Sequence, residues 1–352
     1  MGDTSQQIVE QILDARSDKR GLRIVGADTK AFIGRAGGGE DLNVSAHRGI
    51  LGYAPRELVL TARAGTPLTE IEAALDERGQ MLSFEPPRFG DGATLGGTLA
   101  CNLSGPARPW GGSIRDMVLG VGLINGRGEM LNFGGQVMKN VAGFDVSRLQ
   151  AGALGAFGVL TQVSLKVLPQ PASTATRVLE LDAAGALERI TSLARSPQPL
   201  SGAAWCDGRA YVRFSGAQSA VTDAARRCGG EALPEARAFW RDLADQRLPF
   251  FDNTEPLWRF SIKPTATVPG IDGRWLIDWA GAQRWIHGHF DRTALEHAAE
   301  AGGGHVSLYR GGDRDSEVNH RLPEALKLLH QRLKRAFDPD GLFNRGRLYS
   351  WL

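Results

Sequence analysis

Two glycine-rich stretches in the first third of the sequence have residue types and spacing suited to binding phosphate. The first is Gly26-Ala27-Asp28-Thr29-Lys30, which continues to Arg35, and the second is Thr94-Leu95-Gly96-Gly97, which continues through Asn102 to Gly105. Backbone N–H groups in tight glycine turns can surround a pyrophosphate without a bulky side chain in the way. We interpret both as candidate dinucleotide-binding loops, although an ordinary glycine turn is an equally good interpretation of either one alone.

Motifs for other kinds of site are absent from the sequence. It contains neither a GxxxxGKS or GxxxxGKT phosphate loop nor HExxH, and the GxGxxG pattern of Rossmann folds follows no predicted strand. The pair His287-Gly288-His289 lacks a third ligand at a suitable spacing, so we interpret it as a surface loop. Cys101, Cys206 and Cys228 form no CxxC pattern. We therefore expect no metal site, disulfide framework or iron–sulfur cluster on this chain.

Hydrophobic periodicity predicts the elements that position the two stretches. The first half has the pattern of a helix, a strand that leads into the first stretch, a capped helix and a later hairpin: 5–20, 22–25, 58–64, 66–79, 118–124, 129–133 and 159–168. Most of the 45 glycines precede residue 160. Such an excess suits a backbone wrapped around a ligand, and a loop-rich surface is the alternative.

The second half changes in character after Pro169 and Pro171. It predicts alternating helices and strands at 183–194, 203–214, 217–228, 275–279, 293–301, 305–309 and 322–336, which is an α+β pattern. Trp275, Ile277 and Trp279 alternate along one predicted strand, as a core-facing side does, and a partner interface is the alternative. We expect a first domain over 1–171, a second over 172–335 and a C-terminal segment, 336–352, that returns to the first.

Length and charge limit the classes of partner. A chain of 352 residues is long enough for two domains, and 41 basic residues nearly balance 39 acidic ones. Without a strong positive field, we expect no nucleic acid as a partner. The polar start predicts no signal peptide, and no stretch is apolar enough to span a bilayer. We therefore expect a cytoplasmic protein.

A third stretch, residues 110–168, relates these features to a known family. It contains Trp110-Gly111-Gly112-Ser113-Ile114-Arg115-Asp116 and the glycine-rich run from Gly152 to Thr161. Together with Gly96 to Ala100, these motifs resemble, in order, the FAD domain of the vanillyl-alcohol oxidase type of flavoprotein. The resemblance covers residues from about 10 to about 170. Gly111 stands where the family usually has an aromatic residue.

A closer resemblance extends over nearly the whole chain. The motifs that carry it are similar to those of the smaller FAD-binding subunits of bacterial glycolate oxidases. They are Gly26 to Phe32, Phe84-Glu85-Pro86-Pro87, Arg108-Pro109-Trp110, Met138-Lys139-Asn140-Val141-Ala142-Gly143, Pro249-Phe250-Phe251 and the tail from Phe337 to Arg347. In that tail Arg345 replaces the usual proline.

The resemblance implies a two-lobed FAD-binding domain of the vanillyl-alcohol oxidase type, followed by a smaller α+β cap domain. It implies an FAD that contacts Gly26, Ala27, Asp28, Thr29, Lys30, Thr94, Leu95, Gly96, Gly97, Asn102, Gly105, Gly112, Ser113, Arg115, Gly158 and Val159. Some relatives attach FAD covalently to a histidine in the first loop. Lys30 and the absence of histidine there imply noncovalent FAD.

The resemblance also implies oxidation of glycolate within a complex. The partners would be a larger FAD-binding catalytic subunit and an iron–sulfur subunit, which could bring the chain to a membrane without a span of its own. Hydroxy-acid oxidation needs a base and a cation for the carboxylate. His305 is a weak candidate for the base, and Arg259, Arg310 and Arg347 are unranked candidates for the cation. A self-sufficient FAD-dependent 2-hydroxy-acid dehydrogenase and a flavin-free scaffold subunit remain alternatives.

Overall fold

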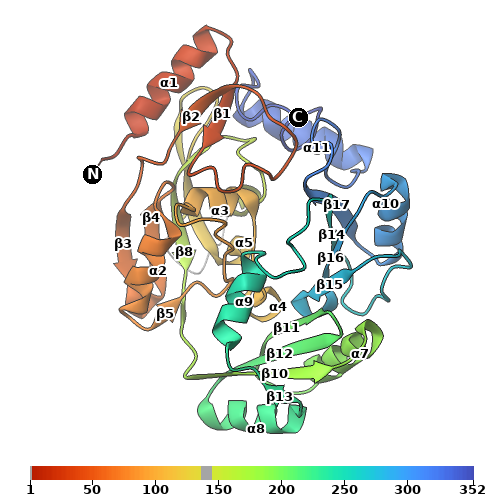
Figure 1. Ribbon diagram of the computed structural model, residues 1–352. Coiled ribbons are helices and arrows are strands. Elements are labelled where there is room, and N and C mark those ends of the chain that lie inside the picture. Colours follow the sequence, from red (N-terminus) through yellow and green to blue (C-terminus); the bar gives the residue numbers. More distant parts are fainter. Residues whose placement is uncertain (1, 136–144) are drawn as a thin grey trace.

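The computed structural model describes residues 2–135 and 145–352 (Figure 1). The motif from Met138 to Gly143 lies outside the described residues. Each half of the chain is built around its own antiparallel sheet, and the C-terminal end lies beside the first strands of the chain. The mixed α+β fold predicted from the sequence is confirmed.

The first half contains a five-stranded sheet whose core is aliphatic. Its order is β3 (Ile50–Ala54), β4 (Val59–Arg63), β8 (Val159–Lys166), β6 (Val118–Ile124) and β7 (Met130–Gly134). Leu60, Val163 and Leu165 are fully buried in it. α2 (Leu68–Asp76) and α3 (Leu95–Cys101) pack on this sheet through Leu68, Ile71, Leu75, Leu95 and Leu99. The sheet thereby fixes the position of α3.

Smaller elements surround this sheet. α1 (Ser5–Ser17) packs against a parallel pair, β1 (Leu22–Val25) and β2 (Glu40–Asn43). A two-stranded sheet, β5 (Gln80–Met81) with β9 (Leu168–Pro169), closes the other end. The short elements are η1 (Pro55–Glu57), α4 (Arg108–Gly111), α5 (Ile114–Met117) and α6 (Val146–Leu149). β1 ends where the first glycine-rich stretch begins, as predicted.

The second half contains an eight-stranded antiparallel sheet that is covered on both faces. Its order is β13 (Glu231–Ala232), β10 (Ser173–Glu180), β12 (Arg209–Gly216), β11 (Leu200–Cys206), β15 (Trp275–Asp278), β16 (Gln283–His287), β14 (Leu257–Ser261) and β17 (His305–Arg310). α7 (Ala183–Ala194), α8 (Gln218–Cys228) and α10 (Arg292–Ala301) pack on one face. α9 (Ala236–Ala244) packs on the other, between this sheet and the first half.

One predicted detail of this sheet is wrong. The alternation that the sequence predicts through Trp275, Ile277 and Trp279 stops at Asp278, where β15 ends. Trp279 has a left-handed φ of 52° and begins the short η2 turn (Trp279–Gly281), so it leaves the strand direction. Trp275 itself is buried in the core, as predicted.

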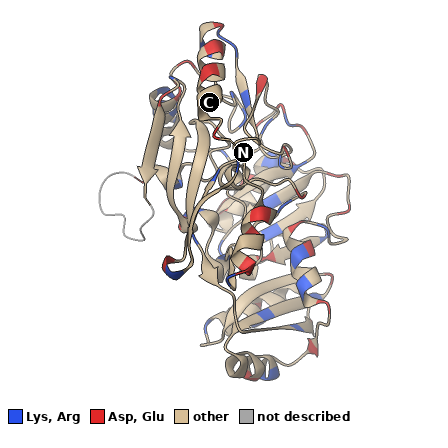
Figure 2. Ribbon diagram, turned by 90° about the vertical axis from the view of Figure 1, so that its left-hand side faces the viewer, with Lys and Arg blue, Asp and Glu red and all other residues tan. Residues whose placement is uncertain are grey.

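Acidic and basic residues are interspersed along both halves of the chain (Figure 2). Among the described residues, no helix is both long and apolar enough to cross a bilayer. Nor do the described histidine, cysteine and acidic side chains form a group that could hold a metal ion.

Candidate functional site

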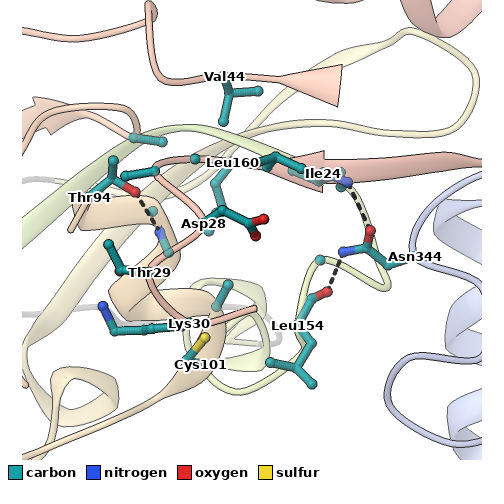
Figure 3. Close-up of a pocket in the computed structure, with 18 of the residues that line it drawn as sticks. Ile24, Asp28, Thr29, Lys30, Val44, Thr94, Cys101, Leu154, Leu160 and Asn344 are labelled. Carbon is teal, nitrogen blue, oxygen red and sulfur yellow. Dashed lines mark hydrogen bonds between the residues drawn. The ribbon is translucent and has the colours of Figure 1, made fainter. Parts of the chain in front are cut away.

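A cavity lies where β1, α3 and the C-terminal tail meet (Figure 3). Its lining comes from four segments that are distant in sequence. They are 24–30, 94–101, 154–160 and 344–347, with Val44 and Ala64 between them. Gly26, Ala27, Asp28, Thr29, Lys30, Thr94, Gly96, Gly97 and Gly158, all predicted from the sequence, line this cavity together.

The loop after β1 carries a row of unused hydrogen-bond donors. The backbone N–H groups of residues 26–30 make no hydrogen bond to any described part of the chain. Asp28 has a left-handed φ of 56°, which turns the loop back on itself. A side chain at Gly26 would place its Cβ 2.7 Å from Thr94 Oγ1, so only glycine fits there. Successive free N–H groups in a tight turn are the backbone arrangement that binds phosphate.

The turn at the start of α3 shapes the cavity but has fewer donors to offer. The N–H groups of Leu95 and Gly96 donate to Thr66 O at 2.9 Å and Ala64 O at 2.7 Å. Gly97 N donates to the capping Thr94 Oγ1 at 3.2 Å. This turn therefore forms part of the cavity wall, and the free backbone donors are those of the loop 26–30.

Two basic side chains line the cavity. Lys30 is only 6% exposed, and its one hydrogen bond among the described residues is a long one, from Nζ to Arg88 O at 3.4 Å. No carboxylate oxygen in the described chain lies within 4.0 Å of it, and burial lowers its pKa. Arg347 from the tail is the second cation. The Asp28 carboxylate is offset by Arg23, whose Nη1 lies 3.1 Å from Asp28 Oδ2.

The tail closes the cavity through Asn344. Its side chain accepts a hydrogen bond from Ile24 N at 2.8 Å and donates one to Leu154 O at 2.5 Å. Asn344 thereby connects β1 to the 154–158 turn, as Figure 3 shows. A Cβ at Gly155 would lie 2.6 Å from Asn344 Nδ2, so a glycine is needed at this contact.

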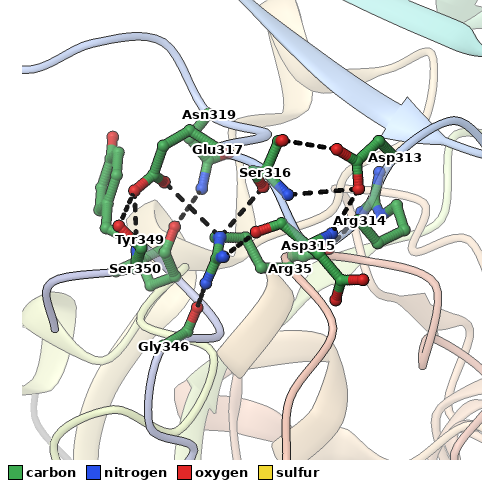
Figure 4. Close-up of polar contacts among 12 residues, drawn as sticks. Arg35, Asp313, Arg314, Asp315, Ser316, Glu317, Asn319, Gly346, Tyr349 and Ser350 are labelled. Atoms are coloured by element: carbon green, nitrogen blue, oxygen red, sulfur yellow. Dashed lines mark hydrogen bonds and ion pairs between the residues drawn. The ribbon is translucent and has the colours of Figure 1, made fainter.

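Arginine side chains hold the far end of the first loop. Arg314 Nη2 donates to Phe32 O at 2.6 Å. Arg35 donates to Ser316 O at 3.0 Å and to Gly346 O at 2.9 Å, so it connects the loop both to the segment after β17 and to the tail (Figure 4). Together with the bond from Ile24 N to Asn344, these contacts fix the loop at both ends, and the free N–H groups lie between them.

Seven residues predicted to contact the cofactor lie elsewhere. Leu95 and Val159 are fully buried in the core: Leu95 lies on the face of α3 that packs on the sheet, and Val159 begins β8 and packs against α1 and β1. Asn102 ends α3 in a left-handed conformation. Gly105 borders a second cavity. Gly112, Ser113 and Arg115 belong to the α4–α5 turn, which does not line the first cavity.

The weak base candidate also lies away from this cavity. His305 is exposed at the start of the edge strand β17 and lines neither the first nor the second cavity. Sequence reasoning, in turn, missed lining residues from apolar and tail segments: Ile24, Val25, Val44, Ala64, Ala100, Cys101, Leu154, Gly155, Leu160 and Asn344. Some of them did lie within motifs that the sequence analysis singled out. Leu154, Gly155 and Leu160 belong to the run from Gly152 to Thr161, Ala100 and Cys101 to the second glycine-rich stretch, and Asn344 to the tail motif.

Comparisons with known proteins define the class to which this fold and cavity belong. Residues 2–134 match the protein family described as FAD binding domain. The fold superposes on alkyldihydroxyacetonephosphate synthase with a TM-score of 0.64 at 14% identity, covering 96% of this chain and 75% of that one. The chain thus has the fold of the vanillyl-alcohol oxidase type of flavoprotein, with an FAD-binding domain.

The particular family follows from similarity along the whole chain. It is 45% identical over 350 residues to the glycolate oxidase subunit GlcE of Escherichia coli (strain K12), which covers 99% of both chains. A D-lactate dehydrogenase of Anaerostipes hadrus is 30% identical over 143 residues, 41% of this chain and 30% of that one. The chain belongs to the family of the glycolate oxidase subunit GlcE, and the family predicted from the sequence is confirmed.

Cys101 provides a chemical probe of the cavity. Burial raises the pKa of its thiol, so we expect slow alkylation by iodoacetamide at neutral pH. Bound FAD should slow it at least tenfold further, because Cys101 lines the cavity. Peptide mass mapping gives the rate, and Cys206 and Cys228, which do not line it, serve as internal controls. An FAD-independent rate at Cys101 would contradict a site in this cavity.

Proposed function

We propose that this chain is the FAD-binding subunit of a complex that oxidises glycolate to glyoxylate and passes the electrons to partner subunits. The observation that carries the proposal is the row of N–H groups at residues 26–30, which are free within the described chain, beside Lys30, which has no described carboxylate oxygen within 4.0 Å. A pyrophosphate, with two negative charges, matches these donors. The GlcE relative, a glycolate oxidase subunit, supports the choice of reaction.

The chain's own groups have distinct tasks in this proposal. The loop 26–30 donates to the pyrophosphate, Lys30 and Arg347 offset its charge, and Asn344 holds the two walls of the cavity together. Apolar residues such as Leu154 and Leu160 exclude water from the bound dinucleotide. When bound, FAD supplies a two-electron acceptor for hydride.

We further propose that the FAD is held noncovalently. The described residues that line the cavity include no histidine. Cys101 lines the cavity and carries a thiol that could bond to a flavin. Burial raises the pKa of this thiol, which disfavours the reactive thiolate. The lining residues would therefore hold FAD through electrostatic contacts and hydrogen bonds.

We propose a larger FAD-binding catalytic subunit and an iron–sulfur subunit as partners, and a cytoplasmic location with any membrane association made through them. We also propose that residues 1–171 form the FAD-binding domain, 172–335 the cap domain and 336–352 a segment that belongs with the first. The bond from Asn344 N to Leu22 O, 2.8 Å long, supports that last assignment.

Glycolate added to the FAD-loaded chain without oxygen tests the proposed role. We expect the visible flavin absorption to persist with the chain alone and to bleach once the larger subunit is added. Rapid bleaching of the chain alone would overturn this role in favour of a self-sufficient 2-hydroxy-acid dehydrogenase. A chain that takes up no FAD, either alone or with the larger subunit, would instead be a scaffold subunit.

A further inference from the structure

A second, smaller cavity lies between the two halves of the chain. The first half contributes Pro87 and the segment 103–105, and the second contributes the end of α9 and the face of the eight-stranded sheet. The cavity shares no lining residue with the first one. It adjoins the first through segment 96–105, because Cys101 of the first cavity packs in one apolar cluster with Leu103 and Tyr309 of the second.

Arg259 brings an uncompensated positive charge to this cavity. Its guanidinium lies 5.2 Å from the Trp279 ring centre and 6.0 Å from that of Trp285. Its Nε is buried and has no hydrogen-bond partner in the described chain. No described carboxylate oxygen lies within 4.0 Å of it, and residues 136–144 contain no Asp or Glu. Arg259 is half-buried, and a cation shielded from water without a counter-ion is costly, so the site favours an anion.

The other polar groups of the cavity do not cancel this charge. Ser104 is 7% exposed, and its Oγ has no partner among the described residues. Asp278 accepts a hydrogen bond from Trp279 N at 2.7 Å but has no described cation within 4.0 Å. Burial raises the pKa of Asp278 to about 7, so near neutral pH a large share of this carboxyl is uncharged. The Tyr309 hydroxyl, whose pKa burial also raises, stays neutral.

We propose that this cavity binds the carboxylate of a small organic acid, with the Arg259 guanidinium paired to the carboxylate and the Ser104 hydroxyl as a hydrogen-bond donor. The planar guanidinium matches a carboxylate in a two-pronged geometry. The Trp279 and Trp285 rings hold Arg259 in place and exclude water. This inference rests on the proposed function, in which glycolate is the substrate. The ligand we propose is therefore a 2-hydroxy acid of two or three carbons.

Arg108 provides a matched control. It stacks on the same Trp279 ring, 4.4 Å from its centre, but does not line the cavity. Replacing either Arg108 or Arg259 by methionine removes one guanidinium group from the face of the Trp279 ring. Only the second change removes a charge from the cavity.

The test is calorimetric titration of the FAD-loaded full chain with glycolate in the absence of oxygen. We expect Arg259→Met to weaken glycolate binding about 10- to 100-fold, which is the range for losing a charged hydrogen-bond pair. Ser104→Ala should weaken it by less than about tenfold, and Arg108→Met should leave it within about twofold. Without ligand, Arg259→Met should melt no lower than the wild type, because it removes a half-buried charge that has no counter-ion among the described residues.

The flavin content of each sample separates the possible failures. Wild-type chain that holds FAD but shows no glycolate binding would overturn the inference and leave the proposed function standing. Equal glycolate affinity for the wild type and for Arg259→Met would also overturn it. Arg259→Met that loses FAD would show that this arginine serves the cofactor instead, which contradicts the inference. A wild-type chain that takes up no FAD would contradict the proposed function.

Discussion

Replacing Asp338 by alanine is expected to lower the free energy of unfolding by about 3–5 kcal/mol, because it breaks a buried ion pair. Asp338 is 1% exposed, and its Oδ2 lies 2.8 Å from Lys334 Nζ. Its carboxylate also accepts hydrogen bonds from Leu342 N at 2.9 Å and Phe343 N at 2.8 Å. Alanine leaves those two N–H groups without a partner and the Lys334 ammonium without its counter-ion. Lys334 also donates to Ala156 O, so the loss extends to the 154–158 turn, part of which lines the first cavity.

Asp340 provides the control for this prediction. It lies two residues further along the same turn and pairs with Arg16 at 2.7 Å, but both side chains are more than 40% exposed. Asp340→Ala should therefore cost only about 0–1 kcal/mol. Urea unfolding followed by circular dichroism measures both changes. Equal losses for the two variants would contradict a structural role for the buried pair in docking the tail.

Replacing Lys30 by methionine is expected to change FAD affinity and stability in opposite directions. We expect FAD binding to weaken about 10- to 100-fold, because a charged hydrogen bond to phosphate is lost. Without FAD, the variant should be as stable as the wild type or more stable. The reason is that Lys30 is buried without a described carboxylate nearby, and burial already lowers its pKa. FAD titration and thermal melting of the same samples measure the two effects.

Lys263→Met serves as the control for Lys30. Lys263 is an exposed lysine in the second half and does not line the cavity. Its replacement should leave FAD affinity within about twofold of the wild type. A Lys30 variant that binds FAD as tightly as the Lys263 variant would show that the pyrophosphate does not lie beside this lysine.

Much of the fold could be predicted from periodicity, and the failures have physical reasons. The helices at 183–194 and 217–228 and the strands at 118–124 and 159–168 were predicted within a few residues. β2 was missed because three of its four residues, Glu40, Asp41 and Asn43, are polar and exposed. β16 was missed because Arg284 interrupts its apolar pattern. That arginine is fully buried and is satisfied by carbonyls such as Thr267 O at 2.6 Å.

Part of the candidate site could likewise be predicted from the sequence, and part of it could not. Glycine-rich segments such as 26–30 and 94–97 could be found from composition, because close backbone approaches need glycine. Which N–H groups remain free depends on partners such as Ala64 O and Thr66 O, which no local pattern specifies. Arg259 was one of three arginines that the sequence could not rank. Only the folded chain shows that it lies half-buried beside Trp279, with no described carboxylate oxygen within 4.0 Å.

The central claim is that this chain holds one FAD, without a covalent bond, in the cavity formed by residues 24–30, 94–101, 154–160 and the tail. The most direct measurement is acid precipitation of the purified, FAD-loaded chain, with the flavin identified by mass spectrometry in supernatant and pellet. We predict about one FAD per chain, all of it in the supernatant. Flavin that stays with the precipitated chain would contradict noncovalent binding, and a chain that neither retains nor takes up FAD would contradict the claim itself.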